Sequence, residues 1–132
     1  MKTETLYKIA ENGNITLDFF PMPKSLSAVL DMDGKYFIAV DPQVLGSQAL
    51  ERVCIAHELG HCETGSTYNI YAPLDLRAKH ENRATKWAVD VLIGREDLEK
   101  AIKNGYRDIC SLAEYFSVTE DFMKKAIEVY KI

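Results

Sequence analysis

The sequence lacks any apolar run long enough to cross a bilayer, since no stretch approaches the roughly 18 residues that a spanning helix requires. Cysteine is also scarce, with three residues in a chain of 132 and no regular spacing of the kind that marks a disulfide framework. The first residues carry no signal-peptide core. We therefore predict a reducing, cytoplasmic location and no membrane partner.

An excess of positive charge is missing too. Sixteen lysines and arginines stand against 20 aspartates and glutamates, which gives a formal net charge of −4 at pH 7. Non-specific nucleic-acid binding needs a positive face, so this balance argues against direct binding of nucleic acid. Residues 112–122 faintly resemble a helix-turn-helix, but the start of the second helix, Thr119-Glu120-Asp121, is acidic and would repel phosphate. We expect a packed helix pair there.

The chain contains no internal repeat, no low-complexity stretch and no linker rich in proline, glycine or serine. Hydrophobic residues make up 47% and charged residues 27%, which is an ordinary composition for a globular protein. A chain of this length can bury a core of its own without disulfides. We therefore expect one domain that spans residues 1–132.

Hydrophobic periodicity predicts an α+β order, because short strands come early and helices follow. Asp33-Gly34 is a favoured two-residue turn, so the strands on either side of it should form a hairpin. We expect a small three-stranded, mainly antiparallel sheet packed on the helix at 47–63 and on further helices. The predicted helices span residues 1–12, 47–63, 78–93, 95–103, 108–116 and 119–131; the predicted strands span 15–19, 28–32 and 35–40; residues 66–77 form a loop.

The informative stretch is His57-Glu58-Leu59-Gly60-His61, an H-E-x-x-H sequence within the predicted helix 47–63. Residues four apart lie on one helix face, so both imidazoles can reach one metal ion. Glu58 projects near that ion without binding it. A hydrolytic zinc site needs this arrangement, in which the histidines hold the metal and the carboxylate takes a proton from the bound water. The alternative is a surface helix with a histidine pair.

A catalytic zinc usually has three protein ligands, so a third must come from elsewhere in the chain. Glu81 is best placed, because it lies twenty residues after His61 in the first turn of the next predicted helix. Small residues on its face would let the two helices pack closely: Ala84, Thr85 and Ala88. A carboxylate that simply favours a helix N-terminus is the alternative for Glu81. The candidates for the third ligand are Glu63, Asp75, His80, Glu81 and Asp90.

Several segments carry a resemblance to a known family: residues 56–65, 68–71, 73–75, 79–84, 87–88 and 92–93. The sequence resembles the ImmA/IrrE family of metallopeptidases, found with mobile elements and stress regulators in bacteria. The likeness runs over roughly residues 1–120. It implies a zincin-like fold and one zinc ion per chain, with His57, His61 and Glu81 as ligands and Glu58 as general base. It also implies a protein substrate, a helix-turn-helix repressor of a phage or mobile element.

A hydrogen-bond donor to the oxyanion that develops during peptide hydrolysis would complete the site. Tyr68, Tyr71 and His80 are candidates for this role or for supporting the ligands, and the sequence favours none of them. The tyrosines also fit the role of loop anchors. The strand at 35–40 comes just before the H-E-x-x-H helix, so we expect its edge to pair with an extended peptide substrate.

A different class of function stays open, a non-catalytic module that binds a regulator through its cleft and carries a structural or vestigial metal site. Glu58 argues against this alternative, because a purely structural site has no need of a base beside the metal. Manganese or iron would also suit two histidines and one carboxylate.

Overall fold

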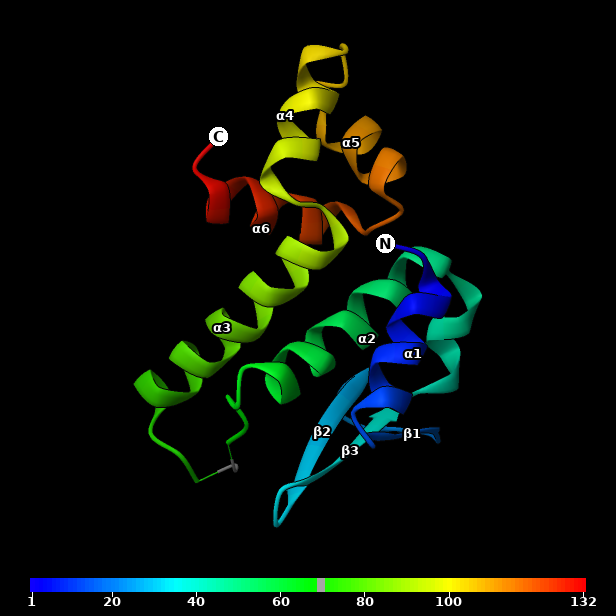
Figure 1. Ribbon diagram of the computed structural model, residues 1–132, viewed down its shortest axis with the longest axis vertical. Coiled ribbons are helices and arrows are strands. Elements are labelled where there is room, and N and C mark those ends of the chain that lie inside the picture. The colour runs from blue at the N-terminus through cyan, green and yellow to red at the C-terminus, as the bar shows by residue number, and fades with distance from the viewer. Residues whose placement is uncertain (69–70) are drawn as a thin grey trace.

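The computed structural model describes residues 1–68 and 71–132. Figure 1 shows the small sheet and α1 on one side of α2, with α3 on another and the remaining helices beyond the end of α3. The elements are α1 (Thr3–Asn12), β1 (Thr16–Phe19), β2 (Ser27–Met32), β3 (Lys35–Val40), the 3-10 helix η1 (Pro42–Gly46), α2 (Gln48–Glu63), α3 (Leu74–Leu92), α4 (Arg95–Lys103), α5 (Ile109–Phe116) and α6 (Glu120–Tyr130).

The predicted α+β class is confirmed, and the sheet has the strand order β1-β3-β2. β2 and β3 form the predicted antiparallel hairpin, in which Asp33 and Gly34 take φ angles of 55° and 87°. β1 pairs parallel to β3, so the sheet is mixed. The prediction that residues 35–40 offer a free edge is wrong, because β3 is central and pairs on both sides. Among the described residues, β2 has a partner only in β3, so its outer edge is free.

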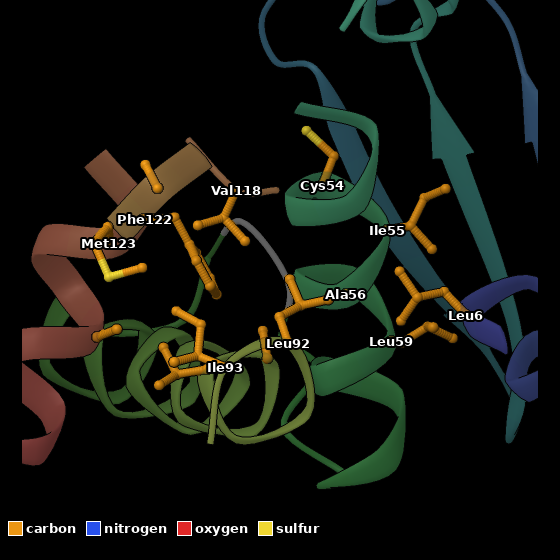
Figure 2. Close-up of a cluster of buried hydrophobic side chains, with 14 of the residues drawn as sticks. Leu6, Cys54, Ile55, Ala56, Leu59, Leu92, Ile93, Val118, Phe122 and Met123 are labelled. Carbon is orange, nitrogen blue, oxygen red and sulfur yellow. The ribbon is translucent and has the colours of Figure 1, made fainter. Parts of the chain in front are cut away.

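Helix α2 forms the centre of the molecule and begins where the sequence predicts, with the Ser47 side chain accepting a hydrogen bond from the Leu50 backbone N–H at 3.3 Å. Apolar side chains of α2 pack against two neighbouring helices, α1 and α3. Figure 2 shows Leu6 of α1 close to Leu59 on one side of α2. On another side, Ala56 faces Leu92 of α3. All four of these apolar side chains are buried, and the buried residues of α2 extend from Arg52 to Cys62.

Small residues let α2 and α3 approach closely, as the sequence predicts. A Cβ atom added to Gly60 would lie 2.5 Å from the backbone oxygen of Ala84, and both Ala84 and Ala88 are fully buried. Helix α3 begins at Leu74, four residues earlier than predicted, because the extended Pro73 directly precedes the first turn. Glu81 therefore lies about two turns inside α3 and not in its first turn.

The close approach at Gly60 yields the first prediction. Gly60→Ala should lower the free energy of unfolding by about 1–3 kcal/mol, because the added methyl group meets helix backbone that cannot rotate away. Chemical denaturation measures the change. Gly46→Ala is the matched control, since nothing lies within 4 Å of a Cβ atom there. Equal stability of the two variants would show that α2 and α3 tolerate separation.

The C-terminal helices pack on each other and on α3. Thr119 caps α6 as predicted, since its hydroxyl accepts a hydrogen bond from the Phe122 backbone N–H at 3.2 Å. Phe122 and Met123 are buried in the core, so the segment at 112–122 is a packed helix pair. No helix in the described part of the chain is both long and apolar enough to cross a membrane.

Candidate metal centre

Two histidines of α2 and one glutamate of α3 converge on a single point. The Nε2 atoms of His57 and His61 lie 2.6 and 3.3 Å from the same carboxylate oxygen, Oε2 of Glu81. One potential ligand atom from each of the three residues lies within 4.8 Å of the others. Because His57 and His61 are four residues apart, the helix places both rings on the face that α3 covers. The three side chains together could hold one metal ion.

The orientation of His61 fits a metal ligand. Its Nδ1 lies 2.9 Å from the backbone oxygen of Ser66, and a carbonyl can only accept, so Nδ1 carries the proton. In the neutral ring, Nε2 then presents a lone pair toward the Glu81 carboxylate. A lone pair and a carboxylate that face each other require a cation between them, a proton or a metal ion. The donor set therefore fits a divalent ion.

Hydrogen bonds within the cluster shift the pKa values of Glu81 and His61. Hydrogen bonds from His57 and His61 hold the pKa of Glu81 well below its usual range, so this carboxyl is ionised. Burial lowers the pKa of His61, but its hydrogen bonds to Glu81 and to Ser66 outweigh that effect and raise the pKa overall. Both directions favour a positive charge between the histidines and Glu81.

Tyr68 supports the same carboxylate from the other side. Its hydroxyl donates a hydrogen bond of 2.6 Å to Oε1 of Glu81, which leaves Oε2 directed at the histidines. Burial and the neighbouring carboxylate raise the pKa of Tyr68 to about 12, so the hydroxyl keeps its proton. Of the two roles expected for Tyr68, the geometry favours support of a ligand.

Glu58 lies beside the cluster and is only 6% exposed. Burial raises the pKa of its carboxyl above the ordinary value. Its Oε2 accepts a hydrogen bond of 2.6 Å from the hydroxyl of Ser27, the first residue of β2. Ser27 is not among the residues that the sequence predicts for the site, because nothing between residues 27 and 58 indicates that the start of β2 meets α2 at this point.

The other candidate residues lie apart from the cluster. The His80 ring is half-buried with Nδ1 3.1 Å from the backbone oxygen of Thr67, and the Tyr71 side chain is 88% exposed. Residues 68–71 were among the segments that resemble the ImmA/IrrE family, and two of them, Asn69 and Ile70, lie outside the described residues. Three further candidates for the third ligand are exposed: Glu63, Asp75 and Asp90.

Two hollows meet at the site. One, of about 300 Å³, lies between β2 and the segment after α2 and reaches Glu58, His61 and Tyr68. The other, of about 590 Å³, extends from His57 to α6. Ser27 and Glu81 line both hollows, so the cluster is accessible from two sides.

Comparison with protein families decides what kind of protein this is. Residues 10–128 match the metallopeptidase family model described as IrrE N-terminal-like domain. The chain belongs to the IrrE N-terminal-like domain family. The resemblance drawn from the sequence is thereby confirmed. Comparisons with curated proteins and with solved structures found no match.

For this IrrE-like chain, the contact between Tyr68 and Glu81 yields the second prediction. Tyr68→Phe removes only the hydroxyl, so the carboxylate loses the donor that orients it. We expect metal affinity to fall by about 10–100-fold, the usual cost of losing an outer partner of a ligand. Competition with a chromophoric chelator measures the affinity. Tyr36→Phe serves as control, because Tyr36 makes no hydrogen bond to the cluster, and equal losses in both variants would contradict the prediction.

Proposed function

We propose that this member of the IrrE N-terminal-like family is a zinc-dependent endopeptidase. The convergence of His57, His61 and Glu81 within 4.8 Å, with the buried Glu58 beside them, is the observation that supports it most strongly. Two imidazoles and one carboxylate as ligands, with a second carboxylate beside them that is not a ligand, are the arrangement of a hydrolytic zinc site. The same set fits the metallopeptidase family to which the chain belongs.

In this proposal His57, His61 and Glu81 hold one zinc ion per chain. A bound zinc ion would supply a Lewis acid and lower the pKa of water toward ~7. The protein contributes the orientation of the ligands, since Ser66 fixes the His61 ring and Tyr68 fixes the Glu81 carboxylate. Glu81 stays ionised, as a ligand requires.

Glu58 acts as the general base and then as the acid that returns the proton to the leaving amine. Its carboxylate has one oxygen, Oε2, held by the Ser27 hydroxyl, so the other oxygen is the one that can exchange a proton. Burial raises the pKa of the carboxyl, which brings its basicity closer to neutral pH. Because the Glu58 carboxylate is buried and held in one orientation, it is suited to proton transfer through its second oxygen.

The substrate backbone would pair with the free outer edge of β2. Ser27, Ala28 and Val29 of this strand line the hollow that also reaches Glu58 and His61. An extended peptide that adds to this edge would run beside the metal centre. β2 therefore takes the role that the sequence analysis gave to β3.

Within this proposal the substrate is a helix-turn-helix repressor of a phage or mobile element, and the protein is a single cytoplasmic domain. The support for this substrate is the resemblance to the ImmA/IrrE family. The free strand edge supports a protein substrate of some kind, since an extended peptide can pair with it.

Co-expression with a helix-turn-helix repressor of a phage or mobile element tests the proposal. We expect repressor fragments with the unaltered protein and intact repressor with Glu58→Gln. Mass spectrometry of the fragments gives the cleavage site. Inactivation of the repressor by the Glu58→Gln variant would instead support the non-catalytic binding module.

A further inference from the structure

The larger of the two hollows at the metal centre extends away from the ligands along α2 and α3. Val53 lies four residues before His57 on α2 and lines this hollow of about 590 Å³. Thr85 lies four residues after Glu81 on α3 and lines it too. Residues four apart share a helix face, so each wall continues for about one helical turn beyond its ligand. The hollow therefore leads from the metal cluster toward α6.

Helix α6 closes the hollow on the side away from the ligands. Phe122, Lys125 and Val129 of this helix line it, and their spacing is that of residues on one helix face. Phe122 is only 4% exposed, so it lies at the bottom of the hollow. Lys125 is exposed and belongs to the rim. One face of α6 is thus directed at the space beside the metal centre.

The inner wall of this hollow is apolar. Four apolar residues line it: Val53, Cys54, Phe122 and Val129. All four are buried or pack partly buried against the core, so their positions are fixed. Outside the metal cluster, the charged residues of the lining are Lys125 and Glu128, which are both exposed and have opposite signs. An apolar bottom with a rim of balanced charge suits an apolar group better than a charged one.

The hollow is continuous with the place where a substrate would pair with β2. Ser27 and Glu81 line both this hollow and the smaller one, whereas Ala28 and Val29 of β2 line only the smaller one. A peptide that pairs with β2 beside the metal centre would therefore pass from the smaller hollow into the larger one. The residues on the two sides of the cleaved bond would then lie in different hollows.

We propose that the hollow between α2, α3 and α6 selects the substrate by binding one large apolar side chain, such as leucine or phenylalanine, next to the cleaved bond. The inference rests on the proposed function, since it takes the metal cluster as the place of cleavage. The volume of about 590 Å³ is in the range of pockets that enclose small ligands, so such a side chain has room. The C-terminal helix α6 thereby determines specificity at a site whose metal ligands lie on α2 and α3.

Binding of three capped tripeptides to the zinc-loaded Glu58→Gln variant tests this pocket. Each peptide has alanine at both ends and leucine, alanine or glutamate in the middle, and the variant is chosen because it should leave the peptides uncut. Titration followed by NMR gives the dissociation constants. We expect the leucine peptide to bind about tenfold tighter or more than the other two, because only leucine gains from burial of a large apolar side chain.

Val129→Phe, added to the same protein, places a larger side chain in the wall that α6 forms. It should weaken binding of the leucine peptide by about tenfold, to the level of the alanine peptide. Val91→Phe is the matched control, since Val91 is also half-buried but does not line the hollow, and the preference for leucine should remain. Circular dichroism checks folding. If Val129→Phe does not fold, Val53→Phe makes the same test from α2.

Three results would overturn the proposal: equal affinities of the three peptides, tightest binding of the glutamate peptide, or equal losses in Val129→Phe and Val91→Phe. No step of this experiment requires cleavage, so its outcome is separate from that of the repressor experiment. A preference for leucine in a protein that forms no fragments would support the apolar pocket and count against the peptidase. Fragments without a preference for leucine would support the peptidase and overturn the pocket.

Discussion

Glu58→Gln is expected to reduce peptide cleavage by about 10²–10⁴-fold while leaving the fold and the bound metal in place. The amide has the size of the carboxylate and can still contact the Ser27 hydroxyl, but it cannot accept a proton from water. The repressor is purified separately and mixed with each variant, and the initial rate of fragment formation measures the loss. Zinc content and thermal unfolding of the same samples show whether the site stays assembled.

Glu63→Gln is the matched control for this experiment. The residue lies on the same helix, carries the same charge and is exposed, so its loss changes the net charge equally without touching the cluster. We expect near-normal cleavage. A Glu58→Gln variant as active as Glu63→Gln would refute a role for Glu58 as the base.

The second large effect is expected in metal binding. Purified protein should contain about one zinc per chain, and His61→Ala should lower the affinity by more than about 100-fold, because it removes a ligand and not merely an outer partner. Elemental analysis after dialysis against a weak chelator measures the metal content. The His61 ring is nearly fully buried, so unfolding must be checked in parallel.

His80→Ala provides the comparison for metal binding. His80 directly precedes Glu81 in α3, but its ring bonds to the backbone oxygen of Thr67 and lies outside the cluster. We expect this variant to retain its zinc. Loss of zinc from His80→Ala with retention in His61→Ala would mean that the ligand set is wrong.

The features of this site that are determined within a single helix could be predicted from the sequence. The spacing of His57 and His61 determines that both rings lie on one face of α2, whatever surrounds the helix. The capping residues Ser47 and Thr119 begin their helices as predicted, because a cap acts through the backbone of its own first turn.

Features that depend on tertiary contacts could not be predicted from the sequence. The order of the strands is one, because the parallel pairing of β1 with β3 leaves no local trace in either segment. The contact between Ser27 and Glu58 is another, since it joins residues 31 apart through the packing of β2 on α2. The early start of α3 was missed, because residues 74–77 alone have no clear helical periodicity.

The three residues of the metal cluster lie between positions 57 and 81, on two helices that are consecutive in the chain. Such a pair has a low contact order, so closing it costs little chain entropy. An ion that binds this helical hairpin early would bias the folding of the whole chain toward the native topology. In that case the sheet would join a preassembled centre, and Ser27 and the free edge of β2 would take their places last.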